Sequence, residues 1–272
     1  MTVLVCLVAG MSSRFGGKPK PLTIVGPKNE TLIEYSINQA LKQKFSKIIF
    51  VTNYKTEHGF RVIFGNTYKN IPIEYVQQQY DLNKRLRPWG TTDAICTISE
   101  IIDSDPEPFI LINGDDIYGE NVFEAGFSLM KERNANIIGG LKVIQTLPES
   151  GNVNRGIISI NNTDITDKHV TGLKEMLDIS KTSNPELHNE LANINFIGLQ
   201  PCILKDLNDI LNQFKERNKN DMKIECLLPD NLNELIKSGK LILKYFEVLN
   251  PIIGITNPGD EVIMRERLAV IA

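Results

Sequence analysis

The sequence is poor in cysteine and has no excess of charge of one sign. Its four cysteines, Cys6, Cys96, Cys202 and Cys226, are scattered over 272 residues without C-x-x-C spacing. This argues against a disulfide framework or a zinc site and favours reduced thiols in a cytoplasmic protein. The formal net charge is −3. No global positive field therefore gathers nucleic acid, and an anion must be held by a local cluster of cations.

Apolar runs of membrane-spanning length are also missing. The run Val3–Ala9 lacks a basic segment before it and a small-residue cleavage site after it, so it predicts a buried strand and not a secretory signal. His58, His169 and His188 have no triad partner and no metal-ligand spacing. We therefore expect no membrane partner, no nucleic-acid partner and no catalytic histidine.

Two common phosphate-binding fingerprints do not occur. The G-x-x-x-x-G-K-S/T spacing of a P-loop is absent, and so is the G-x-G-x-x-G pattern of dinucleotide-binding folds. Hexapeptide repeats are absent too, so a second, β-helical domain is not expected. A phosphate site in this chain must use a different loop.

Strand and helix patterns alternate along the first half of the chain. We predict strands at residues 3–8, 47–52, 73–77, 109–113 and 135–143, and helices at 32–44, 56–64, 91–102 and 121–133. The connections are too long for hairpins, which predicts βαβ units with right-handed crossovers. The second half is less regular, with strands at 156–160, 169–175, 194–199, 241–247 and 251–255 and helices at 202–217, 232–238 and 258–269.

These elements predict one α/β domain, residues 1–272, with a Rossmann-like, mainly parallel or mixed central sheet flanked by helices. Ligands of such sheets bind beyond the carboxyl ends of the strands. The functional loops should therefore follow Val8, Gln77 and Asn113, and the unusual residues of the sequence do fall there.

The strongest motif is the loop Gly10–Lys20, which follows the first strand directly and reads GMSSRFGGKPK. Glycines and small residues let backbone N–H groups approach phosphate oxygens. Arg14 can grip a phosphate bidentately, and Lys18 or Lys20 supplies a compact charge. A flexible basic surface loop is the alternative, but three cations directly after the first strand favour a triphosphate site.

Two acids, Asp115 and Asp116, follow the predicted strand 109–113 at its carboxyl end. Carboxylate oxygens suit Mg²⁺, which also takes phosphate oxygens and water. A polar turn that closes the strand is the alternative. The position of the two acids, directly after an apolar strand and at the edge of the phosphate loop, favours the metal interpretation.

Three blocks, in order, resemble the sugar-phosphate nucleotidyltransferases, also called nucleoside-diphosphate-sugar pyrophosphorylases. LVAGMSSRFGG at 7–17, with Lys20, is similar to the family signature L-A-A-G-x-G-x-R…P-K. RPWGTTDAI at 87–95 resembles the block P-W-G-T-x-x-A, and PFILINGDDIYG at 108–119 resembles N-A-D-D-F-Y-G. The resemblance implies the nucleotide-diphospho-sugar transferase fold, with a nucleotide-binding part at about 1–145, an acceptor-binding part at about 146–250 and a C-terminal metal loop and helix at 251–272.

The resemblance also implies roles for single residues. Arg14 and Lys20 are the implied catalytic cations, and Asp115 is the first metal ligand, with Asp116 in reserve. The second metal ligand is Asn257 or Asp260, although Asn257 is equally well explained as a helix cap. The implied nucleotide-binding residues are Ala9, Gly10, Met11, Ser12, Ser13, Gln77, Gly90 and Thr91. The implied acceptor-binding residues are Asn113, Gly156, Glu175 and Asn195.

Some positions depart from the family or have a plainer explanation. Ser12 replaces a common glycine, and Asp93 stands where related branches often have histidine, which affects the selection of base or acceptor. An amide can read a base edge, but Gln77 is favoured over its neighbours in the run Gln77–Gln79 only through the resemblance. Arg85 is better explained as a surface arginine than as a phosphate ligand.

We therefore expect a magnesium-dependent enzyme of the EC 2.7.7 class that couples a nucleoside triphosphate, UTP by family analogy, to a sugar 1-phosphate. The acceptor phosphate would attack the α-phosphorus in line, without a general base, because a phosphate monoester is already nucleophilic near neutral pH. Three alternatives remain: a cytidylyltransferase for an alcohol or amide phosphate, a metal-dependent glycosyltransferase of related fold, and a non-catalytic nucleotide sensor.

Overall fold

The computed structural model describes residues 1–10, 19–148, 151–161, 167–255 and 259–271. The strands are β1 (Thr2–Leu7), β2 (Phe45–Thr52), β3 (Thr67–Tyr68), β4 (Ile71–Gln77), β5 (Phe109–Asn113), β6 (Asp116–Ile117), β7 (Asn136–Lys142), β8 (Val153–Ile160), β9 (Val170–Ile179), β10 (Leu191–Leu199), β11 (Leu243–Glu247) and β12 (Ile253–Gly254). The α-helices are α1 (Leu32–Ala40), α2 (Glu57–Phe64), α3 (Thr91–Cys96), α4 (Ser99–Ser104), α5 (Glu120–Arg133), α6 (Ile203–Arg217), α7 (Leu228–Lys237) and α8 (Asp260–Ile271).

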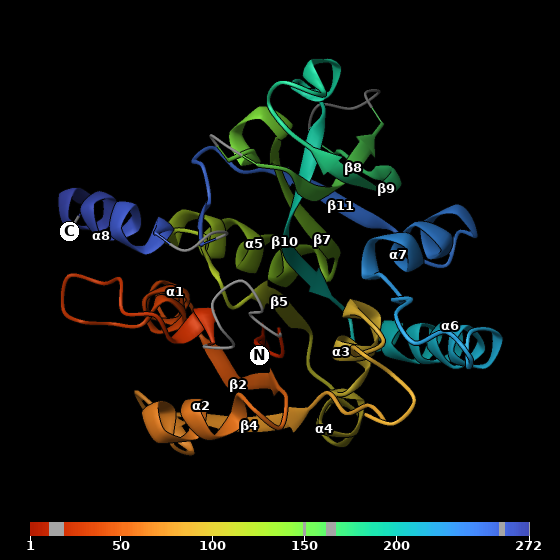
Figure 1. Cartoon of the computed structure of the whole chain (residues 1–272), viewed down its shortest axis with the longest axis horizontal. Coiled ribbons are helices and arrows are strands. Elements are labelled where there is room, and N and C mark those ends of the chain that lie inside the picture. The colour runs from red at the N-terminus through yellow and green to blue at the C-terminus, as the bar shows by residue number, and fades with distance from the viewer. Residues whose placement is uncertain (11–18, 149–150, 162–166, 256–258, 272) are drawn as a thin grey trace.

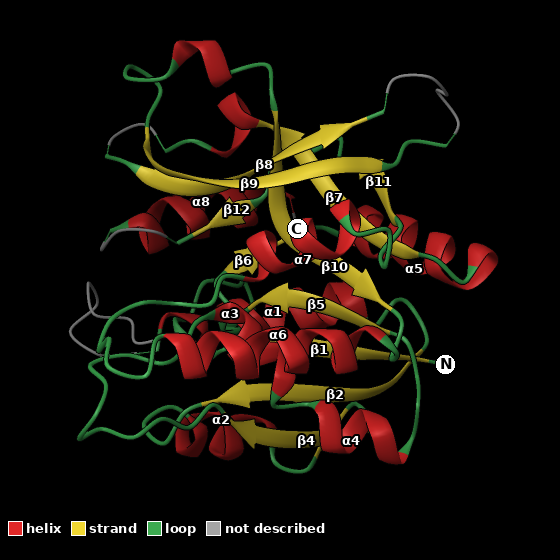
Figure 2. Ribbon diagram, turned by 90° about the vertical axis from the view of Figure 1, so that its right-hand side faces the viewer, coloured by secondary structure: helices red, strands yellow, loops and turns green. Residues whose placement is uncertain are grey.

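One mixed sheet organises the molecule (Figure 1). Its strand order is β11-β7-β10-β5-β1-β2-β4-β3, and the antiparallel pair β8–β9 joins it through β10. The strands β5, β1, β2 and β4 run parallel, as predicted, whereas β10 runs antiparallel to both β5 and β7. The views of Figures 1 and 2 place β8 and β9 at the end of the molecule away from β4. The predicted α/β fold with a mixed central sheet is confirmed.

Alternate residues of β1 enter two separate cores. Val3 and Val5 pack in a cluster with α3, α4, α6 and α7, while Leu4 and Cys6 pack in a second cluster with α1, α2 and α5. Successive side chains of a strand point to opposite faces, so a strand covered on both sides must be apolar throughout. This explains why the first strand is an unbroken apolar run.

The helix predicted at 91–102 is wrong in one respect, because the structure divides it into α3 and α4. The division lies at Thr97 and Ile98. There the hydroxyl of Thr97 donates to the carbonyl of Ala94 over 2.7 Å, and that of Ser99 donates to Cys96 over 2.9 Å. Short hydroxyl side chains compete in this way with the helical ladder. The two-residue strands β3 and β6 were also not predicted.

The carboxyl ends of the parallel strands meet at one edge of the sheet, as predicted. Leu7 of β1 stands opposite Asn113 of β5, and the Gly114 N–H donates to the Leu7 carbonyl over 3.0 Å. On the other side of β1, β2 ends beside Gln77 of β4. The carboxyl ends of β1, β2, β4 and β5 thus lie along one edge of the sheet. No helix within the described residues is long and apolar enough to span a membrane.

Candidate active site

Three segments that are far apart in the sequence meet at Lys20. Lys20 opens a short 3-10 turn, and its ammonium nitrogen lies 3.6 Å from Asp115 Oδ2. The same nitrogen donates to the carbonyl of Ile255 over 3.2 Å, and the Ile255 N–H donates to the carbonyl of Asp115 over 3.2 Å. The side chain of Lys20 is only 16% exposed. Its charge is therefore held at a fixed place beside the acids.

The second acid, Asp116, lies beside Asn113. The amide of Asn113 donates to Asp116 Oδ2 over 3.2 Å. The pKa of Asp116 is raised to about 7, because burial disfavours its charged form and the Asp115 carboxylate repels it. β6, which begins at Asp116, pairs with β12, so that Gly254 stands opposite Asp116. Gly254 and Ile255 of the C-terminal segment thus lie against the two acids.

A cavity of about 780 Å³ opens onto these groups, which is a size typical of small-ligand sites. Six of the predicted site residues line it: Lys20, Asn113, Asp115, Asp116, Asn195 and Asp260. Positive and negative groups thus face one cavity, an arrangement suited to binding a phosphate together with a metal ion.

The predicted acceptor residues lie on β8, β9 and β10. Gly156 and Glu175 stand directly opposite each other in the β8–β9 pair, and a Cβ atom at Gly156 would lie 3.4 Å from Asn193 Cβ and 3.5 Å from Glu175 Oε2. The amide of Asn193 donates to Asn195 Oδ1 over 3.0 Å. Asn193 and Asn195 line the cavity, whereas Gly156 and Glu175 are not part of its wall. Burial raises the pKa of Glu175, and Asp230 raises it further.

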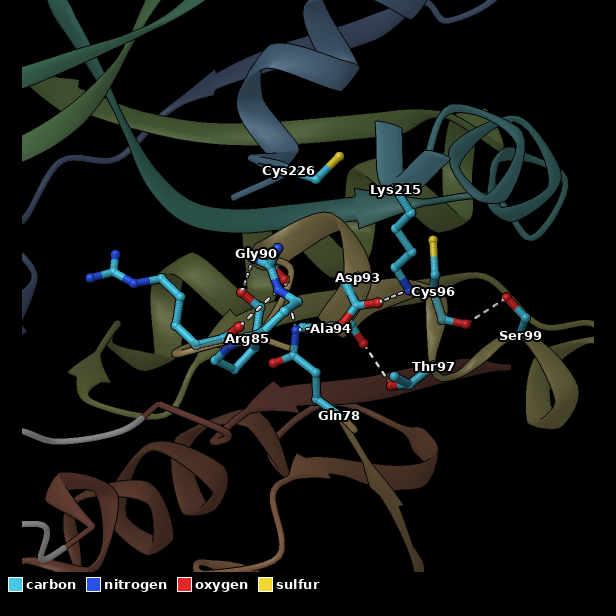
Figure 3. A network of polar contacts seen from close by, with 12 residues as sticks. Gln78, Arg85, Gly90, Asp93, Ala94, Cys96, Thr97, Ser99, Lys215 and Cys226 are labelled. Atoms are coloured by element: carbon cyan, nitrogen blue, oxygen red, sulfur yellow. Dashed lines mark hydrogen bonds and ion pairs between the residues drawn. The ribbon is translucent and has the colours of Figure 1, made fainter. Parts of the chain in front are cut away.

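The predicted base-reading residues are divided between two places. Gln77 donates from Nε2 to Glu57 Oε2 over 2.7 Å. Its neighbour Gln78 donates from Nε2 to the Gly90 carbonyl over 2.8 Å and to Asp93 Oδ2 over 2.9 Å (Figure 3). The structure therefore places Gln78 beside Gly90. Sequence reasoning did not select Gln78, although strand alternation puts it on the opposite face from Gln77.

The loop before Gly90 is fixed from the other half of the chain. Arg85 is 3% exposed, not a surface residue as expected, and its guanidinium carbon lies 3.4 Å from the centroid of the Trp89 ring. It donates to the carbonyls of Asp221 and Ile224. Burial lowers the pKa of Arg85. Arg85 and Trp89 thus hold the loop to the segment between α6 and α7.

Several predicted residues lie outside the described part of the chain, namely Met11, Ser12, Ser13, Arg14, Lys18 and Asn257. Of the rest of the nucleotide set, Ala9 is buried and its carbonyl accepts from Asn53 Nδ2 over 2.7 Å. The hydroxyl of Thr91 accepts from the N–H of Leu228 over 2.8 Å. Within the described ranges, three or more His, Cys, Asp or Glu side chains nowhere gather as a metal-binding cluster.

Comparison with known proteins defines the class. Residues 8–182 match the family model described as nucleotidyl transferase. Because the match spans more than half of the chain, the protein belongs to the nucleotidyltransferase family and is an enzyme of the EC 2.7.7 class. No curated protein sequence matches the chain.

Solved structures show the same fold. A glucose-1-phosphate thymidylyltransferase from Bacillus anthracis has a TM-score of 0.73 at 13% identity, over 98% of this chain and 95% of that one. A UDP-glucose pyrophosphorylase in complex with UDP-glucose has a TM-score of 0.70 at 18% identity, over 100% of both chains. The UTP-bound UGPase of Acinetobacter baumannii has a TM-score of 0.68 at 14% identity, over 100% of this chain and 94% of that one.

Replacing Gly90 with alanine is expected to destabilise the fold. Gly90 has a φ of 102°, and a Cβ atom there would lie 2.6 Å from the carbonyl oxygen of Cys226. Strain and overpacking together should cost about 2 to 4 kcal/mol of unfolding free energy in urea denaturation. Gly239→Ala is the matched control, because Gly239 also has a positive φ, 73°, but open space around its Cβ position. Equal losses for the two variants would rule out the clash with Cys226.

Proposed function

We propose that this nucleotidyltransferase couples a nucleoside triphosphate to a sugar 1-phosphate and releases pyrophosphate, with Mg²⁺ as cofactor. UTP is the preferred triphosphate in this proposal. The observation that carries the proposal is the 3.6 Å approach of Lys20 to Asp115 at the wall of one large cavity. The asparagines of the predicted acceptor side line the same cavity. The similar solved structures include a thymidylyltransferase and enzymes bound to UDP-glucose or UTP, which supports a pyrimidine nucleotide.

The donor set at the end of β5 fits magnesium. Asp115 and Asp116 offer carboxylate oxygens, and Mg²⁺ is usually held by one or two carboxylates together with substrate phosphates and water. Burial and the neighbouring Asp115 raise the pKa of Asp116, and a divalent cation would offset that repulsion. Asp260 lines the same cavity and remains a candidate for a further ligand. When bound, the metal would neutralise charge on the triphosphate and polarise its phosphoryl oxygens.

The residues of the chain supply position and charge. An oxygen of the acceptor phosphate attacks the α-phosphorus, and the bond from that phosphorus to the bridging oxygen of the pyrophosphate breaks. Lys20, fixed by Asp115 and the Ile255 carbonyl, stabilises the negative charge that grows on the α-phosphoryl group and the leaving pyrophosphate. Arg14, which follows β1 in the sequence, is proposed to assist. Both substrates are held in line, so most of the catalysis comes from positioning.

Arg155 of β8 supports an anionic acceptor. Its guanidinium donates to Thr146 Oγ1 over 3.1 Å, to the Thr146 carbonyl over 2.6 Å and to the Asn154 carbonyl over 2.9 Å. Guanidinium has five N–H groups, so one remains on each terminal nitrogen. Arg155 lines the cavity, and the charges of Asp116 and Glu175 act on its guanidinium without a direct ion pair in the described part of the chain. A cation oriented by neutral oxygens is suited to grip a phosphate brought by the substrate.

Replacing Arg155 with glutamine is therefore expected to raise the KM for the acceptor about tenfold or more, because one charge-assisted hydrogen bond is lost. The KM for the triphosphate should change little, because the change is made on the acceptor side. Initial rates of pyrophosphate release, measured against each substrate, check this. Arg217→Gln, at an exposed position of α6, is the control. An unchanged acceptor KM would remove Arg155 from the site.

A matrix assay tests the proposed function as a whole. Pyrophosphate release is measured for four nucleoside triphosphates against a panel of sugar 1-phosphates, alcohol phosphates and amide phosphates, with and without Mg²⁺. Turnover of UTP with a hexose 1-phosphate supports the proposal. Turnover of CTP with an alcohol or amide phosphate identifies a cytidylyltransferase instead. Sugar transfer without pyrophosphate indicates a glycosyltransferase, and binding without turnover in any pair indicates a sensor.

A further inference from the structure

The buried carboxylate of Asp93 takes no part in the mechanism described above. It lies on the first turn of α3 and is 5% exposed. Its Oδ1 accepts from the ammonium of Lys215 on α6, and its Oδ2 accepts from Gln78 Nε2 over 2.9 Å (Figure 3). A buried carboxylate is costly unless it is paired and hydrogen-bonded. The ammonium of Lys215 neutralises the charge of Asp93, so the hydrogen bond from Gln78 is not needed for that purpose.

That bond fixes which end of the Gln78 amide faces which way. Gln78 Nε2 donates both to Asp93 and to the Gly90 carbonyl. An amide nitrogen has two N–H groups, so both are used. Turning the amide over would place its oxygen against two acceptors, which is repulsive. The oxygen of Gln78 is therefore held on the other side, and Figure 3 shows it pointing away from Asp93.

The fixed amide lies beside Gly90, one of the residues proposed to contact the nucleobase. Gly90 is itself held by the backbone on either side of it, because the Trp89 carbonyl accepts from the Cys226 N–H over 2.6 Å and the Thr92 N–H donates to the Cys226 carbonyl over 3.1 Å. Within the described ranges the Gly90 N–H donates no hydrogen bond, and Gln78 Oε1 accepts none. One donor and one acceptor of fixed position are thus left beside each other.

We propose that Asp93, held by Lys215, is a positioning residue for nucleobase selection, which acts by presenting Gln78 Oε1 to the base of the bound triphosphate. This inference rests on the proposed function. A fixed oxygen accepts from the ring N3–H of uracil or thymine. Cytosine carries an unprotonated ring nitrogen at that position, so oxygen and nitrogen lone pairs would repel each other. The network therefore favours uridine and thymidine triphosphates over cytidine triphosphate.

Exchange of Asp93 for asparagine tests the inference. The asparagine side chain can offer its nitrogen to Gln78, so only the Gly90 carbonyl still fixes the Gln78 amide, which should turn over more readily. Calorimetry with Mg²⁺ gives the dissociation constants of UTP and CTP for the full chain without an acceptor. Wild type is expected to prefer UTP, and Asp93→Asn should lower the preference about tenfold, the equivalent of one hydrogen bond. Lys215→Met should shift it in the same direction, and Lys205→Met, an exposed lysine of the same helix, should leave it unchanged.

The outcomes distinguish a positioning role of Asp93 from a purely structural one. A lower melting temperature with an unchanged UTP-to-CTP ratio makes Asp93 structural only and overturns the inference. So does a wild type that shows no preference or prefers CTP. If Asp93→Asn does not fold, the ratio for Lys215→Met decides. If wild type binds no triphosphate at all, the proposed function fails, which is a result distinct from binding without selection.

Discussion

Lys20→Ala is expected to lower kcat about a thousandfold, as loss of a fixed group that stabilises developing charge does in other enzymes. The ammonium of Lys20 is mostly buried and held by Asp115 and the Ile255 carbonyl. Alanine removes a positive charge from the place where the leaving pyrophosphate gains negative charge. Because kcat should fall more than the affinity for the triphosphate, the loss lies mainly in the transition state. Pyrophosphate release in a coupled assay measures it.

Two controls accompany this variant. Lys28→Ala removes an exposed lysine on the same connection between β1 and α1, and it should behave like wild type. The melting temperature of Lys20→Ala should stay close to that of wild type, because an ion pair of a partly exposed acid contributes little to stability. Near-normal pyrophosphate release by Lys20→Ala would refute the role given to this residue.

Asp115→Ala is expected to have the second large effect, with turnover lowered about a thousandfold or more, as for groups that hold a catalytic metal ion and its charge. The carboxylate of Asp115 is 37% exposed at the cavity, so its loss should spare the fold. The variant should also need a higher Mg²⁺ concentration for half-maximal rate. Initial rates over a series of Mg²⁺ concentrations measure both effects.

Asp103→Ala provides the matched control for this variant, because Asp103 is an exposed acid on α4, away from the cavity lining. It should keep the wild-type rate and the wild-type Mg²⁺ dependence. A rate for Asp115→Ala within a few-fold of wild type, at the same Mg²⁺ concentration, would show that Asp115 holds no essential metal ion. The acid Asp116 would then take its place as the first candidate.

Much of the fold could be predicted because the local pattern and the final environment agree. β1 and β5 are buried on both faces and are therefore apolar throughout, and the parallel topology then places Lys20 and Asp115 at one edge. A strand is predicted at residues 251–255, where β12 lies, but its pairing with β6 could not be predicted. β6 has only two residues, too few to show any periodicity. The break between α3 and α4 coincides with hydrogen bonds from the Thr97 and Ser99 hydroxyls to backbone carbonyls. Such bonds weaken a helix only slightly, so the sequence alone does not predict where it breaks.

The parts of the site that sequence reasoning missed depend on contacts between distant segments. Asp93 and Lys215 are separated by 122 positions, and neither carries a local signal of the other. In the glutamine run, strand alternation predicts that Gln77 and Gln78 face opposite sides, but only the structure shows that Gln78 is the one that contacts Gly90. Arg155 is next to a predicted residue, Gly156, but its hydrogen bonds to Thr146 and its place at the cavity are visible only in three dimensions.

The central claim is tested most directly by a crystal structure with Mg²⁺ and a non-hydrolysable analogue of UTP. We predict that the metal ion bridges the Asp115 carboxylate and the triphosphate, that Lys20 contacts the phosphate chain, and that the base lies against Gly90 and Gln78. A triphosphate bound elsewhere, with Lys20 and Asp115 touching neither metal nor phosphate, would contradict the assignment of this cavity as the active site.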